Sequence, residues 1–496
     1  MNASAAKVND RRRWLALYVL CVGMLMIVLD ITIVNVALPS IQSDLGFSQN
    51  NLAWVVNAYL IPFGGLLLLA GRIGDLVGQR RVFLTGLAVF TAASVLCALA
   101  QSQGMLIGAR FLQGIGGALT SAVILGMIVM MFPEPKEQAK AIGMYTFVAV
   151  SGSSIGLLAG GALTEAINWH WIFFINVPIG IATALFAVRL IDNRDGIGVG
   201  QGADILGAVL ITVGLMLGVY TILEVEQQGW GSTQTLALGG VSLALLAAFI
   251  VRQGRITNPL MPLRLFRSRN VGGANLVQAL TVVGMFGLFF LGALYMQRIL
   301  GYDALEVGLA FLPATIVMGA MTFRFTALLN IRFGAKATLL PGMVLIGAGM
   351  ALFALTPVDA TYAVDLLPAM IVFGLGAGLA FPSLMTLAMS GATRSDSGLA
   401  SGLVNTSVQV GGAIGLAVLA TLSTERTDGL LADGEPMANA LNSGYHLAYV
   451  LGVVLVAAAT VVAVAVLQPE DKAAEQLGEE EEEHEPPRTE PAYSEA

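Results

Sequence analysis

Long apolar segments alternate with short polar ones along almost the whole chain. An α-helix of about twenty residues crosses the hydrocarbon core of a bilayer. Only helices or closed barrels satisfy every backbone polar group inside lipid. The pattern therefore predicts an all-α integral membrane protein with fourteen transmembrane helices. The fourteen apolar segments are 14–38, 52–70, 82–101, 105–131, 139–163, 171–190, 203–224, 235–251, 270–297, 305–326, 338–356, 364–390, 397–423 and 445–467.

The composition agrees with this interpretation and excludes an ordinary cytosolic enzyme. Hydrophobic residues make up 56% of the chain and charged residues only 11%, whereas soluble proteins carry about 25% charged residues. The two cysteines, Cys21 and Cys97, lie inside apolar segments and have neither a disulfide pattern nor metal-ligand spacing. We expect no metal, no bound cofactor and no nucleic acid partner.

Basic residues divide the polar segments into two classes. Of the 25 lysines and arginines, 22 lie in the two tails and in alternate loops. The intervening loops hold only Arg298 and Arg426, and Arg110 lies inside an apolar segment. Loops rich in lysine and arginine stay on the cytoplasmic side. This split predicts a multi-pass membrane protein with both termini in the cytoplasm. The richness in alanine, glycine and valine fits the inner (cytoplasmic) membrane of a bacterial cell.

The sequence also repeats itself. Residues 114–119 resemble residues 374–379, at an offset of 260 positions. Gly152 and Gly156 match Gly411 and Gly415 at an offset of 259, and a third match has an offset of 256. Near-constant offsets indicate two homologous halves of six helices each, with two helices inserted between them. An insert with an even number of helices preserves the orientation of the second half in the membrane, as parallel repeats require.

These observations give a predicted organisation in five parts. The acidic tail has the composition of a disordered segment, with a run of glutamates and a proline pair. The parts are a cytoplasmic N-terminal segment at 1–13, a six-helix half at 14–190, a two-helix insert at 203–251, a second six-helix half at 270–467 and the cytoplasmic tail at 468–496.

The loop after the second segment combines glycines with charges. Glycines permit a tight turn and close approach of helices. The acid of this loop, Asp75, can pair with cationic groups or with a helix N-terminus in one of two conformational states. A merely basic loop explains the arginines but not the spaced glycines with an acid, so we interpret the loop as a conformational gate. Its residues are Gly71, Arg72, Gly74, Asp75, Gly78, Arg80 and Arg81.

This loop resembles the signature loop of the major facilitator superfamily, which lies between the second and third spans on the cytoplasmic side. Residues 110–114 resemble the buried-arginine motif of that family, and residues 29–39 and 169–180 resemble its fourteen-span drug–proton antiporters. A glycine-rich run in the fifth segment is similar to the antiporter motif, although Gly156-Leu157 replaces the usual Gly-Pro pair. The glycines of this run are Gly152, Gly156, Gly160 and Gly161. The resemblance implies the major facilitator fold and export from the cell.

Asp30 and Arg110 are ionisable residues within apolar segments. A charge at the bilayer centre costs about 2.5–3.5 kcal/mol, which makes such residues functional candidates. Burial disfavours the charged form of a carboxyl, so that proton gain and loss near neutral pH becomes feasible for Asp30. We interpret Asp30 as the proton-coupling carboxylate, assisted by Arg110. Alternatively, Asp30 is bound permanently to a polar neighbour such as Asn35 or Arg110, and Arg110 braces its helix against backbone carbonyls.

Four other acids fall at the ends of segments on the predicted outer side. We interpret each as a solvated residue at the membrane boundary. They are Glu165, Glu224, Glu306 and Asp365.

The energy source follows from what the sequence lacks. It has no glycine-rich phosphate loop with an adjacent lysine, so ATP hydrolysis is not expected. An ion gradient remains, and one charge moving through 100 mV supplies about 2.3 kcal/mol. Two parallel halves imply a substrate site between them near the midplane, exposed to each side in turn as the halves rock.

The sequence therefore favours a secondary active transporter that exports small amphipathic or drug-like compounds by proton antiport. Its partners would be membrane lipid, a small-molecule substrate and protons. A dedicated exporter of one metabolite, such as a self-made antibiotic, a siderophore or a lipid precursor, is the first alternative. A non-transporting membrane sensor is the second, although such a protein needs neither the charged loop nor Asp30. The oligomeric state stays open, and a monomer is compatible with the sequence.

Overall fold

The computed structural model describes residues 3–47, 52, 54–198, 204–256, 259–266, 268–302, 304–390 and 397–469. Over these residues the chain forms helices and connecting turns, and no strand. The predicted acidic tail lies outside the described residues, apart from its first two residues.

Twelve helical segments of the described chain are long and apolar enough to cross a membrane. They coincide with twelve of the fourteen predicted segments, which confirms the all-α membrane architecture. The other two predicted segments, 139–163 and 397–423, fall on α6 (Pro135–Ala166) and α16 (Ser397–Ala432).

The N-terminal helices form a first set. They are α1 (Ala3–Leu45), α3 (Trp54–Val77), α4 (Gln79–Ala98), α5 (Gln103–Met131), α6, α7 (Trp171–Phe174) and α8 (Asn176–Leu190). Because α1 already begins at Ala3, the predicted N-terminal segment 1–13 continues directly into the first predicted span. Alanine, lysine and arginine are strong helix formers, and neither glycine nor proline interrupts this stretch.

The remaining helices form an insert and a second set. The predicted insert, called the insert from here on, corresponds to α9 (Ile205–Gln228) and α10 (Thr233–Gln253), which are followed by the short η1 (Leu263–Phe266). The second set comprises α11 (Arg269–Arg298), α12 (Ala304–Ala320), the π-helix η2 (Met321–Thr326), α13 (Ala327–Phe333), α14 (Ala335–Phe353), the π-helix η3 (Tyr362–Leu366), α15 (Leu367–Ser390), α16 and α17 (Met437–Val466).

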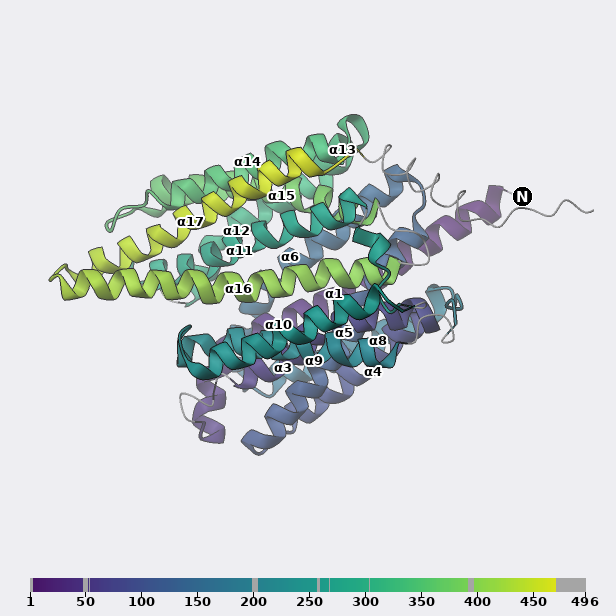
Figure 1. The fold of residues 1–496 in the computed structure, drawn as a ribbon, viewed down its shortest axis with the longest axis horizontal. Coiled ribbons are helices and arrows are strands. Elements are labelled where there is room, and N and C mark those ends of the chain that lie inside the picture. The colour runs from purple at the N-terminus through teal and green to yellow at the C-terminus, as the bar shows by residue number, and fades with distance from the viewer. Residues whose placement is uncertain are drawn as a thin grey trace, which may run out of the picture.

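The two sets meet along a few helices. In the first set α1 packs on α6 and α8, and α5 packs on α3 and α4. In the second set α11 packs on α16 and α17, and α14 packs on α15. Between the sets, α16 packs on α3 and α5, and α6 packs on α12, η2 and α15. Figure 1 shows α16 running along the bundle between the two groups of helices.

The same helix contacts recur in both sets. A Cβ on Gly86 would lie 2.6 Å from the backbone nitrogen of Thr120, and a Cβ on Gly342 would lie 2.8 Å from that of Ala380. A Cβ on Gly116 would likewise collide with the backbone nitrogen of Phe90, and a Cβ on Gly376 with that of Ile346. Equivalent residues of the two sets are 256 positions apart in α4 and α14 and 260 positions apart in α5 and α15, which are the offsets of the internal repeat. The internal repeat is therefore accompanied by equivalent packing of α4 on α5 and of α14 on α15.

The insert lies where the two sets meet. Its helix α9 contacts α10, α3 and α16. One apolar cluster joins Leu68 of α3, Ile211 of α9, Phe249 of α10 and Leu399 of α16, all of them buried. The insert therefore covers the junction of α3 with α16, whereas α6 and α12 meet at a different junction.

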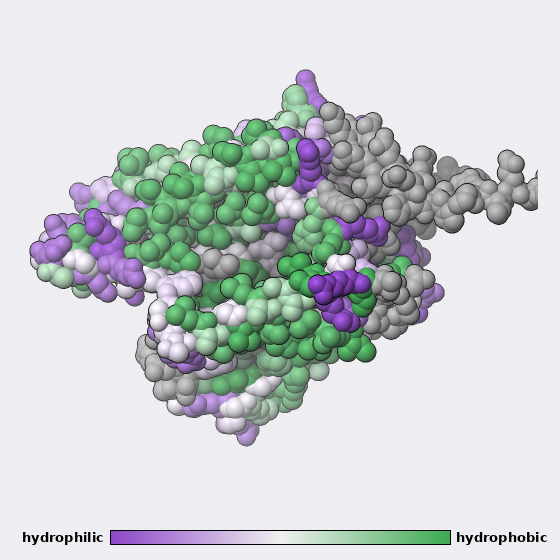
Figure 2. Space-filling model, in the orientation of Figure 1, coloured by the Kyte–Doolittle hydropathy of each residue, from purple (hydrophilic) through white to green (hydrophobic). Residues whose placement is uncertain are grey.

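The outer surface agrees with a lipid environment. Leu243 of α10 and Val461 of α17 are 69% and 68% exposed. Figure 2 shows hydrophobic residues along the flanks of the helices and hydrophilic residues gathered at both ends. We call one end of the bundle the basic end: α1 begins there, and Arg12, Arg80 and Arg81 lie there.

Candidate functional site

The gating loop predicted from the sequence is helical at the basic end except at Gly78, because residues 71–77 end α3 and residues 79–81 begin α4. We keep the name gating loop for these residues. Gly78 has φ +105°, and a Cβ at this position would lie 2.7 Å from the carbonyl oxygen of Arg194. A Cβ on Gly71 would overlap the carbonyl oxygen of Gly398, and one on Gly74 would lie 2.5 Å from Val123. The glycines are needed because the backbone of Arg194 and Gly398 and the side chain of Val123 pack directly against these positions.

Asp75 lies at the N-terminus of α16. Its carboxylate accepts hydrogen bonds from the backbone N–H groups of Gly398 and Leu399, both at 2.9 Å. Gln79 Nε2 donates to Asp75 at 3.1 Å and to the hydroxyl of Ser397 at 3.0 Å. A helix N-terminus carries partial positive charge and free N–H groups, so a carboxylate stabilises it. The predicted loop thus clamps a helix of the other set.

The arginines of the loop are anchored to neighbouring chain segments. The Arg72 guanidinium is buried and donates to the carbonyl of Pro259 at 3.5 Å. Arg80 donates to the carbonyl of Val188 at 2.5 Å, and Arg81 pairs with Asp195 at 2.9 Å. The loop therefore contacts the end of α8, the linker to the insert and the linker after it.

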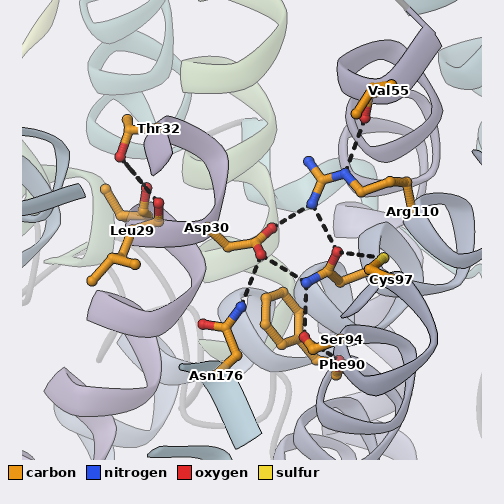
Figure 3. A network of polar contacts seen from close by, with 11 residues as sticks. Leu29, Asp30, Thr32, Val55, Phe90, Ser94, Cys97, Arg110 and Asn176 are labelled. Carbon is orange, nitrogen blue, oxygen red and sulfur yellow. Dashed lines mark hydrogen bonds and ion pairs between the residues drawn. The ribbon is translucent and has the colours of Figure 1, made fainter. Parts of the chain in front are cut away.

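Asp30 and Arg110 form a buried ion pair closer to the opposite end of the bundle. Asp30 is 0% and Arg110 is 1% exposed, and Arg110 Nη1 lies 2.6 Å from Asp30 Oδ2. Figure 3 shows the two side chains pointing toward each other from different helices. The sequence left a choice of neighbours for Asp30, and Arg110 is one of them; the side chain of Asn35 lies outside those described.

Arg110 also braces the helices around it. Its Nε donates to the carbonyl of Val55 in α3 at 3.0 Å. Its guanidinium lies 4.4 Å from the centre of the Tyr59 ring, within the range of a cation–π contact. Both interpretations of Arg110 therefore have a structural counterpart, because one side chain contacts the acid and a backbone carbonyl.

Two carboxamides complete the site, and the sequence analysis did not single them out. Gln113 Nε2 donates to Asp30 Oδ1 at 2.7 Å, and Asn176 Nδ2 donates to the same oxygen at 2.9 Å. Both are 0% exposed. Gln113 occurs one helical turn after Arg110, which was the available signal for it. Asn176 opens α8 and is 146 positions away from Asp30, so only the fold brings the two together.

The glycine-rich face of α6 packs on the turns of α1 around Asp30. A Cβ on Gly152 would lie 3.0 Å from Val28, and one on Gly160 would lie 2.8 Å from the carbonyl of Ile33. Gly156 leaves no room for a Cβ beside Thr32. Gly161 is half-buried on the same helix. This face thus packs closely on the helix that carries the acid.

The acids predicted at the membrane boundary differ in their surroundings. Glu165 and Glu306 are exposed, in agreement with the prediction. Asp365 is half-buried and accepts hydrogen bonds from Thr361. Glu224 is buried at 9% exposure, so the prediction of a solvated residue is wrong there, because α9 packs against α3. Within the described part of the chain, no three potential metal ligands gather into a site.

Comparison with known proteins identifies the family. Residues 20–416 match the Major Facilitator Superfamily. The chain belongs to the Major Facilitator Superfamily. This confirms the resemblance carried by the signature loop and the motifs, and it makes the protein a multi-pass membrane transporter rather than an enzyme.

Similar members of this superfamily are antibiotic resistance and export proteins. The chain is 37% identical over 486 residues to the puromycin resistance protein pur8 of Streptomyces alboniger, covering 96% of both chains. It is 37% identical to the cephamycin export protein CmcT of Amycolatopsis lactamdurans, covering 84% of this chain and 86% of that one. The tetracenomycin C resistance and export protein of Streptomyces glaucescens is 31% identical, with 86% and 79% covered.

Solved structures share the fold. The human organic anion transporter MFSD10 (TETRAN) matches with a TM-score of 0.64 at 13% identity, covering 90% of this chain and 99% of that one. The proton:xylose symporter XylE matches with a TM-score of 0.61 at 15% identity, covering 90% and 95%. At these identities the likeness concerns the major facilitator fold alone.

Proposed function

We propose that the protein exports small amphipathic or drug-like compounds across the cytoplasmic membrane by proton antiport. The observation that carries the proposal is the buried pair of Asp30 and Arg110 in a chain whose relatives are named for antibiotic resistance and export. A carboxylate held by an arginine in a water-poor site can exchange a proton for a cationic partner. The proton gradient supplies the energy, and no bound cofactor is needed.

The proposal includes a specific topology. Fourteen spans, counting α6 and α16, place both termini on the same side of the membrane, and the basic end is cytoplasmic by the distribution of lysine and arginine. Residues 14–190 and 270–467 act as the two halves, and residues 203–251 form the insert. A monomer is sufficient for transport by this scheme, with lipid as its surroundings.

Alternating access supplies the mechanism. The signature loop around Asp75 binds the N-terminus of α16 and favours the state in which the basic end is closed. When the clamp releases, the halves rock and the substrate site between them opens to the cytoplasm. Protonation of Asp30 would weaken its pairing with Arg110, because a neutral carboxyl attracts the guanidinium less. The ion pair thus links proton binding to the packing of α1, α3 and α5.

A reconstituted system tests this function. Purified protein in liposomes with a trapped pH dye and an imposed proton gradient is given cationic and neutral drug-like compounds. We expect compounds to dissipate the gradient with the native protein and not with Asp30→Asn. Glu165→Gln, which removes an exposed acid, is the matched control and should behave as the native protein. Equal responses of the native protein and Asp30→Asn would exclude Asp30 as the coupling residue.

A dedicated exporter of one metabolite is the second candidate. The names of the relatives support it, because puromycin, cephamycin and tetracenomycin C are single antibiotics. The same liposomes distinguish the two candidates. Proton flux with many unrelated compounds indicates a multidrug exporter, whereas flux with one chemical series indicates the dedicated carrier.

A further inference from the structure

Two buried carboxamides contact Asp30, and they differ in how many of their polar atoms are occupied. Gln113 Nε2 donates to Asp30 and to Ser94, and its Oε1 accepts from Arg110 and from the Cys97 thiol. Within the part of the chain that the structure describes, the Asn176 side chain makes one hydrogen bond, from Nδ2 to Asp30 Oδ1 at 2.9 Å, and its Oδ1 is buried without a hydrogen-bond partner. Buried polar atoms of native proteins are nearly always paired, so this oxygen calls for an explanation.

The orientation of the Asn176 amide follows from the charge of Asp30. An ionised carboxylate only accepts hydrogen bonds, so the NH₂ group of the amide must face it. A protonated carboxyl has an O–H group that donates, and a buried O–H group needs an acceptor. Arg110, Gln113 and Asn176 all donate to Asp30, which suits the ionised carboxylate. Once Asp30 is protonated, the same three donors face it, and none of them offers an acceptor for its O–H group.

Asn176 and Gln113 respond differently to this change. Turning the Gln113 amide over would break its bonds to Ser94 and Arg110 as well. Turning the Asn176 amide breaks only its bond to Asp30, and it brings Oδ1 to the position that Nδ2 occupied, 2.9 Å from the carboxyl oxygen. Figure 3 shows the amide oxygen of Asn176 directed away from the carboxylate.

We infer that Asn176 is a positioning residue whose side-chain amide turns over when Asp30 gains a proton. It donates to the carboxylate in one state and accepts from the carboxylic acid in the other. The proton itself binds to Asp30 Oδ1, and Asn176 stays neutral and transfers none. This inference rests on the proposed function, in which Asp30 carries the proton.

The other titratable groups at the site keep their places in this scheme. Arg110 of α5 faces Asp30 directly, and Tyr59 of α3 lies against the guanidinium. Cys97 of α4 donates to Gln113 rather than to the acid. Since none of them contacts Asn176 through a hydrogen bond within the described chain, replacing Asn176 changes the surroundings of Asp30 without removing a charge.

Asn176→Leu tests the inference, because leucine has a similar branched shape and no polar atom. Hydrogen bonds to a charged group are stronger than those to a neutral one. The ionised acid therefore loses more than the protonated acid, and we expect the midpoint of the pH profile of transport to rise by about one pH unit, a tenfold change in proton affinity. The infrared C=O band of protonated Asp30, identified by its absence in Asp30→Asn, should move to higher frequency.

A matched control exists in α17. Asn442 is buried, donates from Nδ2 to the carbonyl of Thr356 at 3.1 Å and also leaves its Oδ1 without a partner. Asn442→Leu should leave the pH midpoint and the infrared band as in the native protein. Asn176→Gln, which keeps an amide, should restore a midpoint near the native one. If Asn176→Leu does not fold, Asn176→Ala removes the same amide group and is measured in its place.

The outcomes separate the inference from the function beneath it. If Asp30→Asn still couples compounds to proton flux, the proposed function fails. If Asp30→Asn is inactive but removing the Asn176 amide shifts neither the midpoint nor the band, the function stands and the role of Asn176 is refuted. A shift in both measurements, with Asn442→Leu unchanged, supports the turning amide.

Discussion

Arg110 combines contacts that a simple positive charge could not make together. Its guanidinium binds the Asp30 carboxylate, the Gln113 side chain and the carbonyl of Val55. The flat face of the same group lies on the Tyr59 ring at 4.4 Å. Three helices thus meet at one side chain, so the position of the guanidinium depends on the protonation of Asp30 and on the packing of α3.

Arg110→Lys should lower the transport rate at least tenfold while leaving the protein folded. Lysine keeps the charge but has one ammonium group, which cannot bind the acid and the Val55 carbonyl while stacking on the ring. Losing one such contact costs about 1–3 kcal/mol. Dye efflux from proteoliposomes measures the effect, and Arg426→Lys, at an exposed arginine, is the control. A native rate for Arg110→Lys would mean that charge alone is required.

At this scale the sequence indicated the charges of the site but not its amides. Asp30 and Arg110 are conspicuous because ionisable residues are rare inside apolar segments. Gln113 and Asn176 carry no charge, and polar uncharged residues are common in this chain. Their importance depends on distances of 2.7 and 2.9 Å to a carboxylate that is 83 and 146 positions away. No local pattern contains that information.

At the level of helices, the clamp between the signature loop and α16 joins elements that are far apart in sequence. Asp75 accepts two backbone N–H groups from the first turn of α16, and the missing Cβ of Gly71 lets that turn approach. The carboxylate compensates the partial charge of the helix end, and the glycine provides the space. Both features are needed for α16 to pack against α3 at the basic end.

Asp75→Asn should weaken this clamp while keeping its shape. A carboxylate at a helix N-terminus contributes about 0.3–2 kcal/mol, so the closed state should open more often. Ser401, one turn into α16 and 0% exposed, can be replaced by cysteine as a reporter. We expect faster labelling of Ser401→Cys by an impermeant maleimide from the basic end when Asp75→Asn is added. Glu165→Gln, at an exposed acid of α6 without a contact to the gating loop among the interactions of the described chain, should leave the labelling rate unchanged.

A second polar cluster joins the start of α9 to the end of α10, around Asp204, which directly precedes the span that begins at Ile205. Asp204 caps α9 through the N–H of Gly207 and pairs with Arg252 at 2.8 Å. Burial alone raises the pKa of the Asp204 carboxyl, but hydrogen bonds from Arg252, Gly207 and Gln253 and the charge of Arg252 outweigh it and hold that pKa below its ordinary 3.8. A lowered pKa means that folding stabilises the ionised form.

The stability contributed by Asp204 should therefore be constant at neutral pH and disappear in acid. With a depressed folded pKa, the contribution is complete above the unfolded value near 3.8 and is lost as pH falls through the folded value. Asp204→Asn should destabilise the protein at pH 7 by about 1–3 kcal/mol, since Arg252 remains partly solvated. Thermal unfolding in detergent across pH checks this, with Asp192→Asn as the control. An equal loss at pH 7 and below the folded pKa would contradict it.

Hydropathy predicted the positions of the helices more accurately than their local helix type, α or π. The twelve spans coincide with predicted segments because lipid requires about twenty apolar residues. The π-helical turn η2 was not predicted. There the hydroxyls of Thr322 and Thr326 both donate to the carbonyl of Gly378 in α15, at 3.2 and 2.7 Å. A tertiary contact fixes this local form, so the segment taken alone gives no signal for it.

For the whole molecule, the insert makes the two junctions between the sets unequal. At the junction of α3 with α16, a Cβ on Gly64 would lie 3.2 Å from Gln409 and 3.4 Å from Val219 of α9. At the junction of α6 with η2, a Cβ on Gly143 would lie 3.6 Å from the methyl group of Thr322. The repeated halves alone predict two similar junctions, and no residue pattern of segment 203–251 indicated which junction it would cover.

Rocking of two halves requires both junctions to separate, and pairs of cysteines can test each one. Gly64→Cys with Gln409→Cys bridges the junction covered by α9, and Gly143→Cys with Thr322→Cys bridges the other. We expect oxidation to stop dye efflux in both double variants and reduction to restore it, because a disulfide joins the halves. The four single variants are the controls, and the native cysteines, Cys21 and Cys97, are buried and stay in place.

The comparison between the two pairs decides how the insert takes part in the motion. If α9 only covers the junction, both bridges should stop transport equally. If the apolar cluster of Leu68, Ile211 and Leu399 keeps α3 and α16 together throughout the cycle, that junction is a hinge. The bridge at Gly64 would then slow efflux only slightly, whereas the bridge at Gly143 would still abolish it. Full efflux with both bridges formed would contradict rocking altogether, because neither junction would then need to open.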